Sequence, residues 1–306
     1  MQEICPIFVD SIPSTNEAVK ALARDGAPEG VLMVAKTQTR GYGRLDRAFF
    51  SPPDTGLYMS LLLRPDFPVE KAHLITHAAA LAVFKAVREL AGEHAAIKWV
   101  NDIYFKGKKA AGILVESALA QNGTLSYAVV GIGINLFAPP FGFPPYLSHV
   151  TAIFPPERQS EFSALRDALI RAVLKHFSTL YDAFPSTDFL EEYKENMLLI
   201  GKDILVYDAL TDREKNGRGT PARAIDISDD GGLLVEYKDG KREVLSAGEV
   251  TLGERKTGAF CKKPPHPKNL WNFRYSEKAL KGVLFLLFHH KILCIPLKFG
   301  EQYDII

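Results

Sequence analysis

The stretch of the chain that decides the fold is IKWVNDIYFKGKKAAGILVE, residues 97–116. Two apolar, strand-like runs flank a polar middle, and the residues from Lys106 to Lys109 have the composition of a turn. The pattern predicts a pair of strands that hold Asn101, Asp102 and two lysines on a rigid hairpin. An ordinary hairpin with a basic turn has the same pattern, so the function of these residues depends on the rest of the chain.

A second polar segment, TQTRGYGRLDRAFFSP, lies upstream at residues 37–52. Two glycines flank Tyr42 in it, and Arg40, Arg44 and Arg47 fall within a short span. Glycine lets backbone N–H groups approach an anion closely, and arginine binds anions through paired hydrogen bonds. The segment predicts a phosphate-binding loop, although it lacks the spacing of a P-loop or a dinucleotide-binding loop. A flexible basic surface loop is the alternative.

Three further segments fit a ligand site. Ser14 and Glu17 form a capping box that predicts the start of a helix, which also explains the polar triplet at residues 14–16 without any ligand. The segment GLYMS at residues 56–60 begins a predicted strand that ends at Arg64. VVGIGIN at residues 129–135 predicts a buried strand, whose glycines indicate close approach of a ligand or another backbone.

In this order, these segments resemble the catalytic domain of the biotin–protein ligases, from about residue 8 to residue 135. The resemblance resumes in a β-module near residues 200–252. The family motifs STN, QTxGRGRxGRxW, GLYxSxxLRP, KWPNDI, KxxGILxE and GIGIN correspond here to residues 14–16, 38–49, 56–65, 98–103, 109–116 and 131–135. The chain departs from them at Tyr42, Asp46, Phe49 and Val100, which replace arginine, glycine, tryptophan and proline.

Three of these departures bear on anion binding. The family arginine at the position of Tyr42 helps to hold the biotin carboxyl group and the adenylate, so tyrosine should weaken anion neutralisation, with Arg40 as a candidate substitute. Asp46 is unfavourable beside a phosphate loop unless Arg44 or Arg47 pairs with it. Phe49 keeps an aromatic face for adenine but lacks the indole donor.

The resemblance implies an α+β fold, with a biotin/lipoate ligase-like catalytic domain of mixed sheet and flanking helices over residues 1–197. A small SH3-like β-barrel is expected over 198–253. Hydrophobic periodicity predicts helices at 14–24, 70–90 and 162–181, and strands at 31–36, 204–206, 222–227, 233–237 and 241–245, with a packed loop at 138–156. Residues 254–306 are an atypical extension, read as a disordered segment or the product of a gene-end error.

The implied reaction joins biotin to a lysine of a biotin carboxyl carrier protein, through biotinoyl-5′-AMP, with ATP and Mg²⁺. The implied catalytic residues are Lys109, Arg44 and Asp102. Biotin is expected to contact Ser14, Thr15, Asn16, Gln38, Gly41, Tyr42, Gly43, Arg44, Lys109 and Gly112; ATP is expected to contact Arg44, Arg47, Phe49, Asn101, Lys109 and Asn135. Gly131 and Gly133 should leave space beside the ligand. Asp102 should accept a proton from the incoming lysine; pairing with Lys98 or capping of the turn is the alternative.

Composition limits the other possibilities. A net charge of +1 on 306 residues argues against a broad surface for nucleic acid or membrane. Three widely spaced cysteines predict a reducing, cytoplasmic location. The N-terminus predicts neither a signal peptide nor a preceding helix-turn-helix domain, which disfavours a DNA-binding repressor. The spacing of Cys261, Cys294 and the nearby histidines matches no zinc site, so no metal site is expected. Formation of a homodimer stays open.

Two rival functions remain. A lipoate ligase of the same fold would share the lysine and the adenylate chemistry, although the motifs at residues 38–49 and 98–103 favour biotin. A catalytically impaired protein that binds biotin or adenylate is the other rival, because of Tyr42 and Asp46.

Overall fold

One mixed sheet of seven strands forms the centre of the computed structural model, which describes residues 3–207, 219–246 and 248–252. The strand order is β1-β2-β3-β7-β6-β5-β4, in which β1 and β2 run parallel and the other neighbours are antiparallel. The strands are β1 (Cys5–Ile12), β2 (Val31–Gln38), β3 (Gly56–Leu63), β4 (Ala95–Lys98), β5 (Asp102–Phe105), β6 (Lys108–Leu119) and β7 (Leu125–Asn135).

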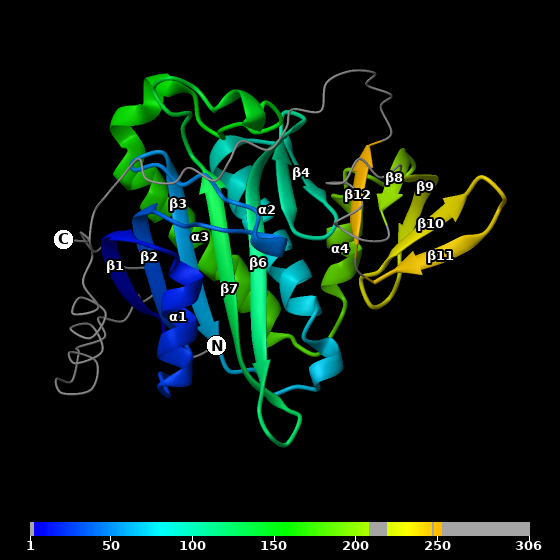
Figure 1. Cartoon of the computed structure of the whole chain (residues 1–306), viewed down its shortest axis with the longest axis horizontal. Helices are drawn as coiled ribbons and strands as arrows, with labels where there is room; N and C mark the ends of the chain where they lie inside the picture. Colours follow the sequence, from blue (N-terminus) through cyan, green and yellow to red (C-terminus); the bar gives the residue numbers. More distant parts are fainter. Residues whose placement is uncertain (1–2, 208–218, 247, 253–306) are drawn as a thin grey trace.

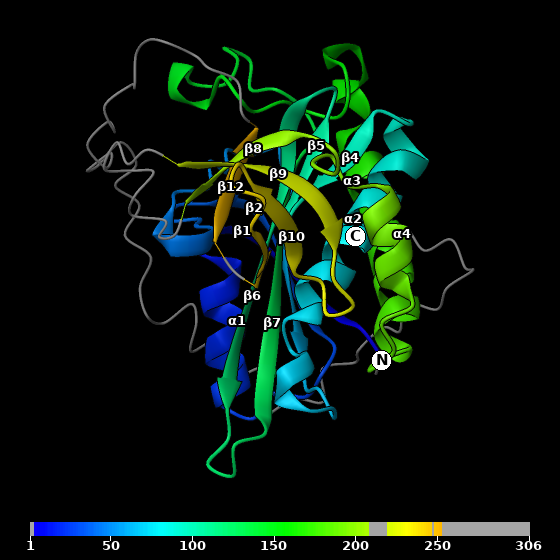
Figure 2. The ribbon, with the colours of Figure 1, turned by 90° about the vertical axis from the view of Figure 1, so that its right-hand side faces the viewer.

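Helices cover both faces of this sheet (Figures 1 and 2). α1 (Thr15–Arg24) packs on one face; α2 (Leu74–Ala91) and α3 (Phe162–Asp182) pack on the other, followed by α4 (Phe189–Glu195). Successive strand residues point to opposite faces. Accordingly, Val31 and Met33 join Val19 of α1 in the smaller core, whereas Leu32 and Val34 join the larger core with α2 and α3.

The C-terminal part of the described chain forms a five-stranded antiparallel sheet, in the order β11-β10-β9-β8-β12. Its strands are β8 (Asp203–Tyr207), β9 (Thr220–Ile227), β10 (Leu233–Tyr237), β11 (Arg242–Leu245) and β12 (Glu249–Leu252). The expected α+β fold with a small C-terminal β-module is confirmed. β12 was not predicted, because four residues are too few to show a clear alternation of apolar and polar side chains. The extension at 254–306 and its cysteines lie outside the described residues.

The hairpin predicted at residues 97–116 differs from the prediction. It contains three strands, because residues 102–105 form β5 between the two expected strands. Ile103 and Phe105 are buried and alternate with half-buried residues, which is the pattern of a strand with one face in the core. The second turn is limited to Lys106 and Gly107, both at positive φ, so Lys109 lies on β6 rather than in a turn.

Two other predicted boundaries shift. The helix expected at 70–90 begins at Leu74, because a separate 3₁₀ turn, η2 (Val69–Lys71), precedes it. The helix expected from Ser14 begins one residue later, and Ser14 is its N-cap: its hydroxyl accepts a hydrogen bond from the backbone N–H of Glu17 at 3.4 Å. Further 3₁₀ turns are η1 (Arg44–Asp46), η3 (Pro145–Leu147) and η4 (Pro156–Glu161).

The β9–β10 turn docks the small sheet against α2 and the turn after β4. The carbonyl oxygen of Gly231 accepts hydrogen bonds from Trp99 Nε1 at 3.0 Å and His77 Nε2 at 2.9 Å, and His73 Nε2 donates to the Asp230 carbonyl at 2.7 Å. Gly231 has φ +84°, and a Cβ there would lie 2.6 Å from His77 Nε2, so the contact requires glycine. Burial lowers the pKa of His77 to about 4.

In the described part of the chain, no helix has the length and apolar character needed to span a bilayer.

Candidate active site

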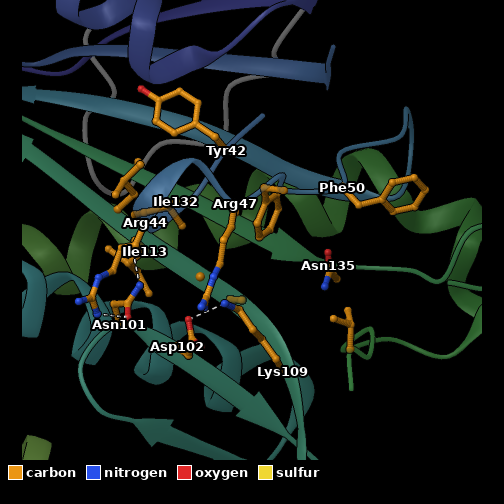
Figure 3. A pocket seen from close by; sticks show the side chains of 18 of the residues that line it. Tyr42, Arg44, Arg47, Phe50, Asn101, Asp102, Lys109, Ile113, Ile132 and Asn135 are labelled. Atoms are coloured by element: carbon orange, nitrogen blue, oxygen red, sulfur yellow. Dashed lines mark hydrogen bonds and ion pairs between the residues drawn. The ribbon is translucent and has the colours of Figure 1, made fainter. Parts of the chain in front are cut away.

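A cavity of about 460 Å³ lies where the N-terminus of α1, the loop at 41–49 and strands β6, β7 and β12 meet. The residues labelled in Figure 3 come from the loop and Phe50 after it, from the turn between β4 and β5, from Asp102 at the start of β5, and from β6 and β7. The predicted site residues that line it are Ser14, Thr15, Asn16, Gln38, Tyr42, Gly43, Arg44, Arg47, Phe49, Asn101, Asp102, Lys109, Gly112 and Asn135. The structure therefore brings together residues that are separated by up to about 120 positions in the sequence.

Gly41 is the predicted site residue that does not line the cavity; it is buried at the start of the loop. A Cβ on Gly41 would lie 2.7 Å from Ser51 Oγ and 2.9 Å from both Gln38 Nε2 and the Phe49 carbonyl oxygen. The glycine thus allows the loop to pack closely against the end of β2, and its contribution to the site is structural.

The loop at 41–49 is a tight, ordered hairpin. Gly43 N–H donates to the Arg47 carbonyl and Phe49 N–H donates to the Gly41 carbonyl, each at 2.8 Å. Leu45 and Asp46 lie at its tip with φ of 56° and 55°, the left-handed region that favours glycine. Asp46, which replaces a family glycine, therefore occupies a backbone conformation suited to that glycine.

The two loop arginines contact the rest of the site and the small sheet. Arg44 donates to Asn101 Oδ1 and to the Gly248 carbonyl, each at 3.4 Å. Arg47 forms a bidentate ion pair with Glu249 of β12, with Nη1–Oε1 at 3.0 Å and Nη2–Oε2 at 2.5 Å. Glu249, which the sequence reasoning missed, is a carboxylate that pairs with Arg47. The loop is thus attached to the C-terminal sheet.

Lys109 and Asp102 form an ion pair in the middle of the cavity, with Nζ–Oδ1 at 2.6 Å (Figure 3). Burial would raise the pKa of Asp102, but the positive charges of Lys109 and Lys98 outweigh it, and the pKa lies below the usual value. Gly112 lies beside the pair, where a Cβ would be 3.4 Å from Lys109 Nζ. The site therefore holds an ionised carboxylate that keeps the lysine in place.

The other end of the cavity is lined by neutral hydrogen-bonding groups. Gln38 Oε1 accepts from the Thr15 backbone N–H at 2.9 Å and from Thr15 Oγ1 at 3.1 Å. Ser60 Oγ lies 2.7 Å from Thr15 Oγ1 and donates to Asn16 Oδ1 at 2.6 Å, while Asn16 Nδ2 donates to Glu116 at 2.8 Å. A connected network therefore fixes the predicted biotin-binding residues on α1 and β2.

The glycines of β7 make room for side chains of the protein. A Cβ on Gly131 would overlap Asn16 Oδ1, and one on Gly133 would lie 2.5 Å from the Phe49 ring. Both glycines also line the cavity, so the expectation that they leave space beside a ligand stays a prediction. Phe49 packs on the sheet, edge-on to Tyr58 with ring centroids 6.3 Å apart.

A segment within the predicted packed loop at 138–156 forms another wall of the cavity. Phe143, Leu147 and Val150 line it, and none of them was among the predicted site residues. Backbone hydrogen bonds from Lys109 N–H to the His149 carbonyl and back from Thr151 N–H to the Lys109 carbonyl, at 3.0 and 2.9 Å, fix this segment to β6. Asn135 supports it, since Nδ2 donates to the Thr151 carbonyl at 3.2 Å.

Tyr42 points away from the ion pair, towards α1 (Figure 3). Its hydroxyl lies 2.6 Å from Glu17 Oε1, 2.9 Å from Glu116 Oε2 and 3.1 Å from Lys20 Nζ. Arg40, the candidate substitute for the family arginine, is exposed and does not line the cavity. The cation nearest to Tyr42 in these contacts is thus Lys20, which the sequence reasoning missed.

Comparison with known proteins agrees with this architecture. Residues 8–135 match the biotin/lipoate A/B protein ligase family, and residues 214–253 match the biotin protein ligase C terminal domain. The bifunctional ligase/repressor BirA of Bacillus subtilis is 34% identical over 81% of this chain and 74% of its own length. The biotin–[acetyl-CoA-carboxylase] ligase of Mycobacterium tuberculosis is 29% identical over 78% of this chain and 85% of its own.

Among solved structures, the biotin protein ligase from Aquifex aeolicus in complex with biotin and ATP superposes with a TM-score of 0.63. It is 25% identical and covers 81% of this chain and 98% of its own. The chain therefore belongs to the biotin/lipoate A/B protein ligase family. Within that family it is a biotin–protein ligase, as are the relatives and the structural neighbour named above.

Proposed function

We propose that this chain activates biotin with ATP as biotinoyl-5′-AMP and then transfers the biotinoyl group to a lysine of a biotin carboxyl carrier protein. The observation that carries the proposal is the polarity of the cavity. One end offers neutral hydrogen-bonding groups, and the other offers Lys109, Arg44 and Arg47. An uncharged ureido ring fits the first end, and the carboxylate and phosphate groups fit the second.

In the first step, the biotin carboxylate attacks the α-phosphorus of ATP, and pyrophosphate leaves. Ser14, Thr15 and Gln38 orient the ureido ring, and Asn16 fixes Thr15 and Gln38 through Ser60. Lys109 binds the carboxylate and α-phosphate oxygens, where negative charge develops, and Arg44 binds phosphate from the loop. Gly43 allows the loop to lie close to the adenylate and exclude water, and Gly41 allows the loop to pack against the end of β2.

The nucleotide lies against the remaining predicted residues. Phe49 lines the cavity beside Gly133 and offers an aromatic ring to the base. Asn101 orients Arg44 through its 3.4 Å contact, and Asn135 holds the wall formed by residues 143–151. Arg47, paired with Glu249, fixes the loop to the small sheet and adds positive charge beside the phosphates.

In the second step, the carrier lysine attacks the acyl carbon, and AMP leaves. The lysine must lose a proton, since its reference pKa of about 10.4 keeps it an ammonium at neutral pH. Two carboxylates line the cavity in the described residues, Asp102 and Glu249, and Glu249 is held on both oxygens by Arg47. We therefore assign to Asp102 the acceptance of this proton, once Lys109 has moved onto the ligand.

Mg²⁺ is expected to enter with the triphosphate. In the described ranges, no group of three acidic, histidine or cysteine side chains is placed to hold a metal. Magnesium commonly binds through substrate phosphates with one or two protein ligands and several waters. The donor set fits that mode, with Asn101, Asn135 or Asp102 as the available oxygen ligands, and the ion would add positive charge at the phosphates.

We further infer the division of the chain: residues 1–197 carry the chemistry and residues 198–253 form the accessory β-module. The wide spacing of the three cysteines supports a cytoplasmic location.

The test is transfer of biotin to a purified carrier domain in the presence of ATP and Mg²⁺, with lipoate and a lipoyl domain as the matched alternative. We expect biotinylation of a single carrier lysine and no lipoylation. Binding of biotin without transfer or adenylate formation would favour the impaired binding protein, and lipoylation would favour the lipoate ligase.

A further inference from the structure

We propose that Tyr42 is a positioning residue that latches the loop at 41–49 closed through Glu17 and Glu116, and that Lys20 supplies the positive charge of this latch. The proposal starts from the direction of the side chain. The Tyr42 hydroxyl reaches α1 and β6, whereas Arg44 and Arg47 of the same loop point into the cavity (Figure 3). Two neighbouring parts of one loop therefore have different partners.

The contacts form a closed cluster. Lys20 Nζ lies 2.7 Å from Glu17 Oε1 and 2.8 Å from Glu116 Oε1, and 5.7 Å from the centroid of the Tyr42 ring. The Lys20 side chain is 17% exposed and that of Glu116 27% exposed, so the contact between them is partly shielded from water, whereas the Glu17 side chain is 53% exposed. Tyr42 brings a neutral hydroxyl to two carboxylates, and the single ammonium of Lys20 offsets their charge.

The latch is connected to the predicted biotin site. Glu116 Oε2 lies 2.9 Å from the Tyr42 hydroxyl, whose single proton is shared between Glu17 and Glu116, and it accepts a hydrogen bond from Asn16, which continues through Ser60 to Thr15. The loop and the hydrogen-bonding end of the cavity are therefore fixed by the same carboxylate. Closure of the loop depends in this chain on a contact made outside the cavity, so residue 42 need not carry a positive charge to the ligand.

Limited proteolysis with trypsin tests the latch without any reaction. Trypsin can cleave the loop after Arg44 or Arg47, and the exposed turn at Lys106 provides an internal reference in the same chain. In the unliganded protein we expect Tyr42→Phe to raise cleavage after Arg44 or Arg47 by about ten-fold relative to Lys106. Tyr146→Phe, which removes an exposed hydroxyl elsewhere, should leave the ratio unchanged.

A charge-exchange series tests the role of Lys20. Lys20→Met leaves Glu17 and Glu116 without their ammonium and should increase cleavage in the loop several-fold. Adding Tyr42→Arg to Lys20→Met supplies a cation from the loop and should return cleavage after Arg44 and Arg47 towards the wild-type rate, with cleavage at the new site after residue 42 scored separately by mass spectrometry. The proposal would be overturned if Tyr42→Phe left the ratio of loop cleavage to Lys106 cleavage unchanged, or raised cleavage at both places equally. It would also be overturned if the loop of the double variant were cleaved as fast as that of Lys20→Met.

A second readout rests on the proposed function: biotinoyl-AMP formed on the enzyme should dissociate about ten-fold faster from Tyr42→Phe than from wild type. An unchanged dissociation rate in an enzyme that makes the adenylate would contradict the latch. Failure of the wild type to make adenylate would contradict the proposed function instead, while the proteolysis result would stand by itself.

Discussion

Replacing Glu249 by glutamine should weaken the use of ATP, although Glu249 belongs to the small C-terminal sheet. The substitution removes the charge that holds Arg47 on two oxygens, at 3.0 and 2.5 Å. The Glu249 side chain is 9% exposed, but that of Arg47 is 37% exposed, so solvent screening reduces the loss. Hydrogen bonds to charged groups contribute about 1.5–3 kcal/mol each, and glutamine keeps one acceptor.

We therefore expect a net loss of about 1.5–2 kcal/mol in the ordering of the loop, which corresponds to a rise of roughly 10- to 30-fold in the KM for ATP. The assay is pyrophosphate exchange at saturating biotin and varied ATP. The affinity for biotin, measured separately by calorimetry, should change by no more than about two-fold, because the hydrogen bonds that hold Thr15 and Asn16 come from β2, β3 and β6.

Glu243→Gln is the matched control. It makes the same change in the same sheet, but the Glu243 ion pair with Lys241 has 3.2 Å between its charged atoms and both side chains are largely exposed. Such pairs contribute about 0–1 kcal/mol. Equal KM values for the two variants would refute the reasoning. A lower KM for ATP in Glu249→Gln would also refute it, because it would mean that Glu249 withholds Arg47 from the nucleotide.

Two other predictions concern the site, and a third concerns the contact between α2 and the β9–β10 turn. Lys109→Ala should reduce adenylate formation by about 10²–10³-fold in single-turnover assays with an unchanged melting temperature, whereas Lys108→Ala, the exposed neighbour, should retain activity. Arg44→Gly should still form adenylate but release it, which mass spectrometry would detect as biotin on lysines of bystander proteins; modification confined to the carrier would argue against this role. His77, with its pKa lowered to about 4, is held neutral in the folded state. The neutral His77 contributes fully to stability above about pH 6.5, and this contribution is lost as the pH falls through 4. The free energy of unfolding, measured in urea, should therefore decrease by about 3 kcal/mol between these two pH values. His77→Gln should flatten this dependence of the free energy of unfolding on pH. Parallel profiles for wild type and His77→Gln would contradict the assignment.

The sequence was most informative where local chemistry determines local structure. Ser14 caps its helix as expected, and the alternation of buried residues in residues 31–36 and 222–227 produced strands. The strand at residues 102–105 was missed because Asn101 and Asp102 have the composition of a turn. The burial of Ile103 and Phe105, which fixes them as a strand, depends on packing against distant elements.

The site residues were likewise predicted where a local motif identifies them and missed where contacts between distant segments place them. All of the predicted site residues except Gly41 line the cavity, but the partners that set their geometry lie far away in sequence. Glu249 is about 200 residues from Arg47, and Glu116 is 74 residues from Tyr42. Gly131 and Gly133 were correctly read as points of close approach, yet the approaching groups are the side chains of Asn16 and Phe49. The spacing of motif residues along the chain does not predict contacts between segments that lie far apart in sequence.

The central claim is that the cavity brings a biotin carboxylate to the α-phosphorus of ATP, and exchange of labelled pyrophosphate into ATP tests it most directly. The account predicts exchange that requires biotin, does not occur with lipoate in its place, and is nearly abolished in Lys109→Ala but not in Lys108→Ala. Exchange that proceeds without biotin, or its absence in a wild-type protein that binds biotin and ATP, would contradict the account.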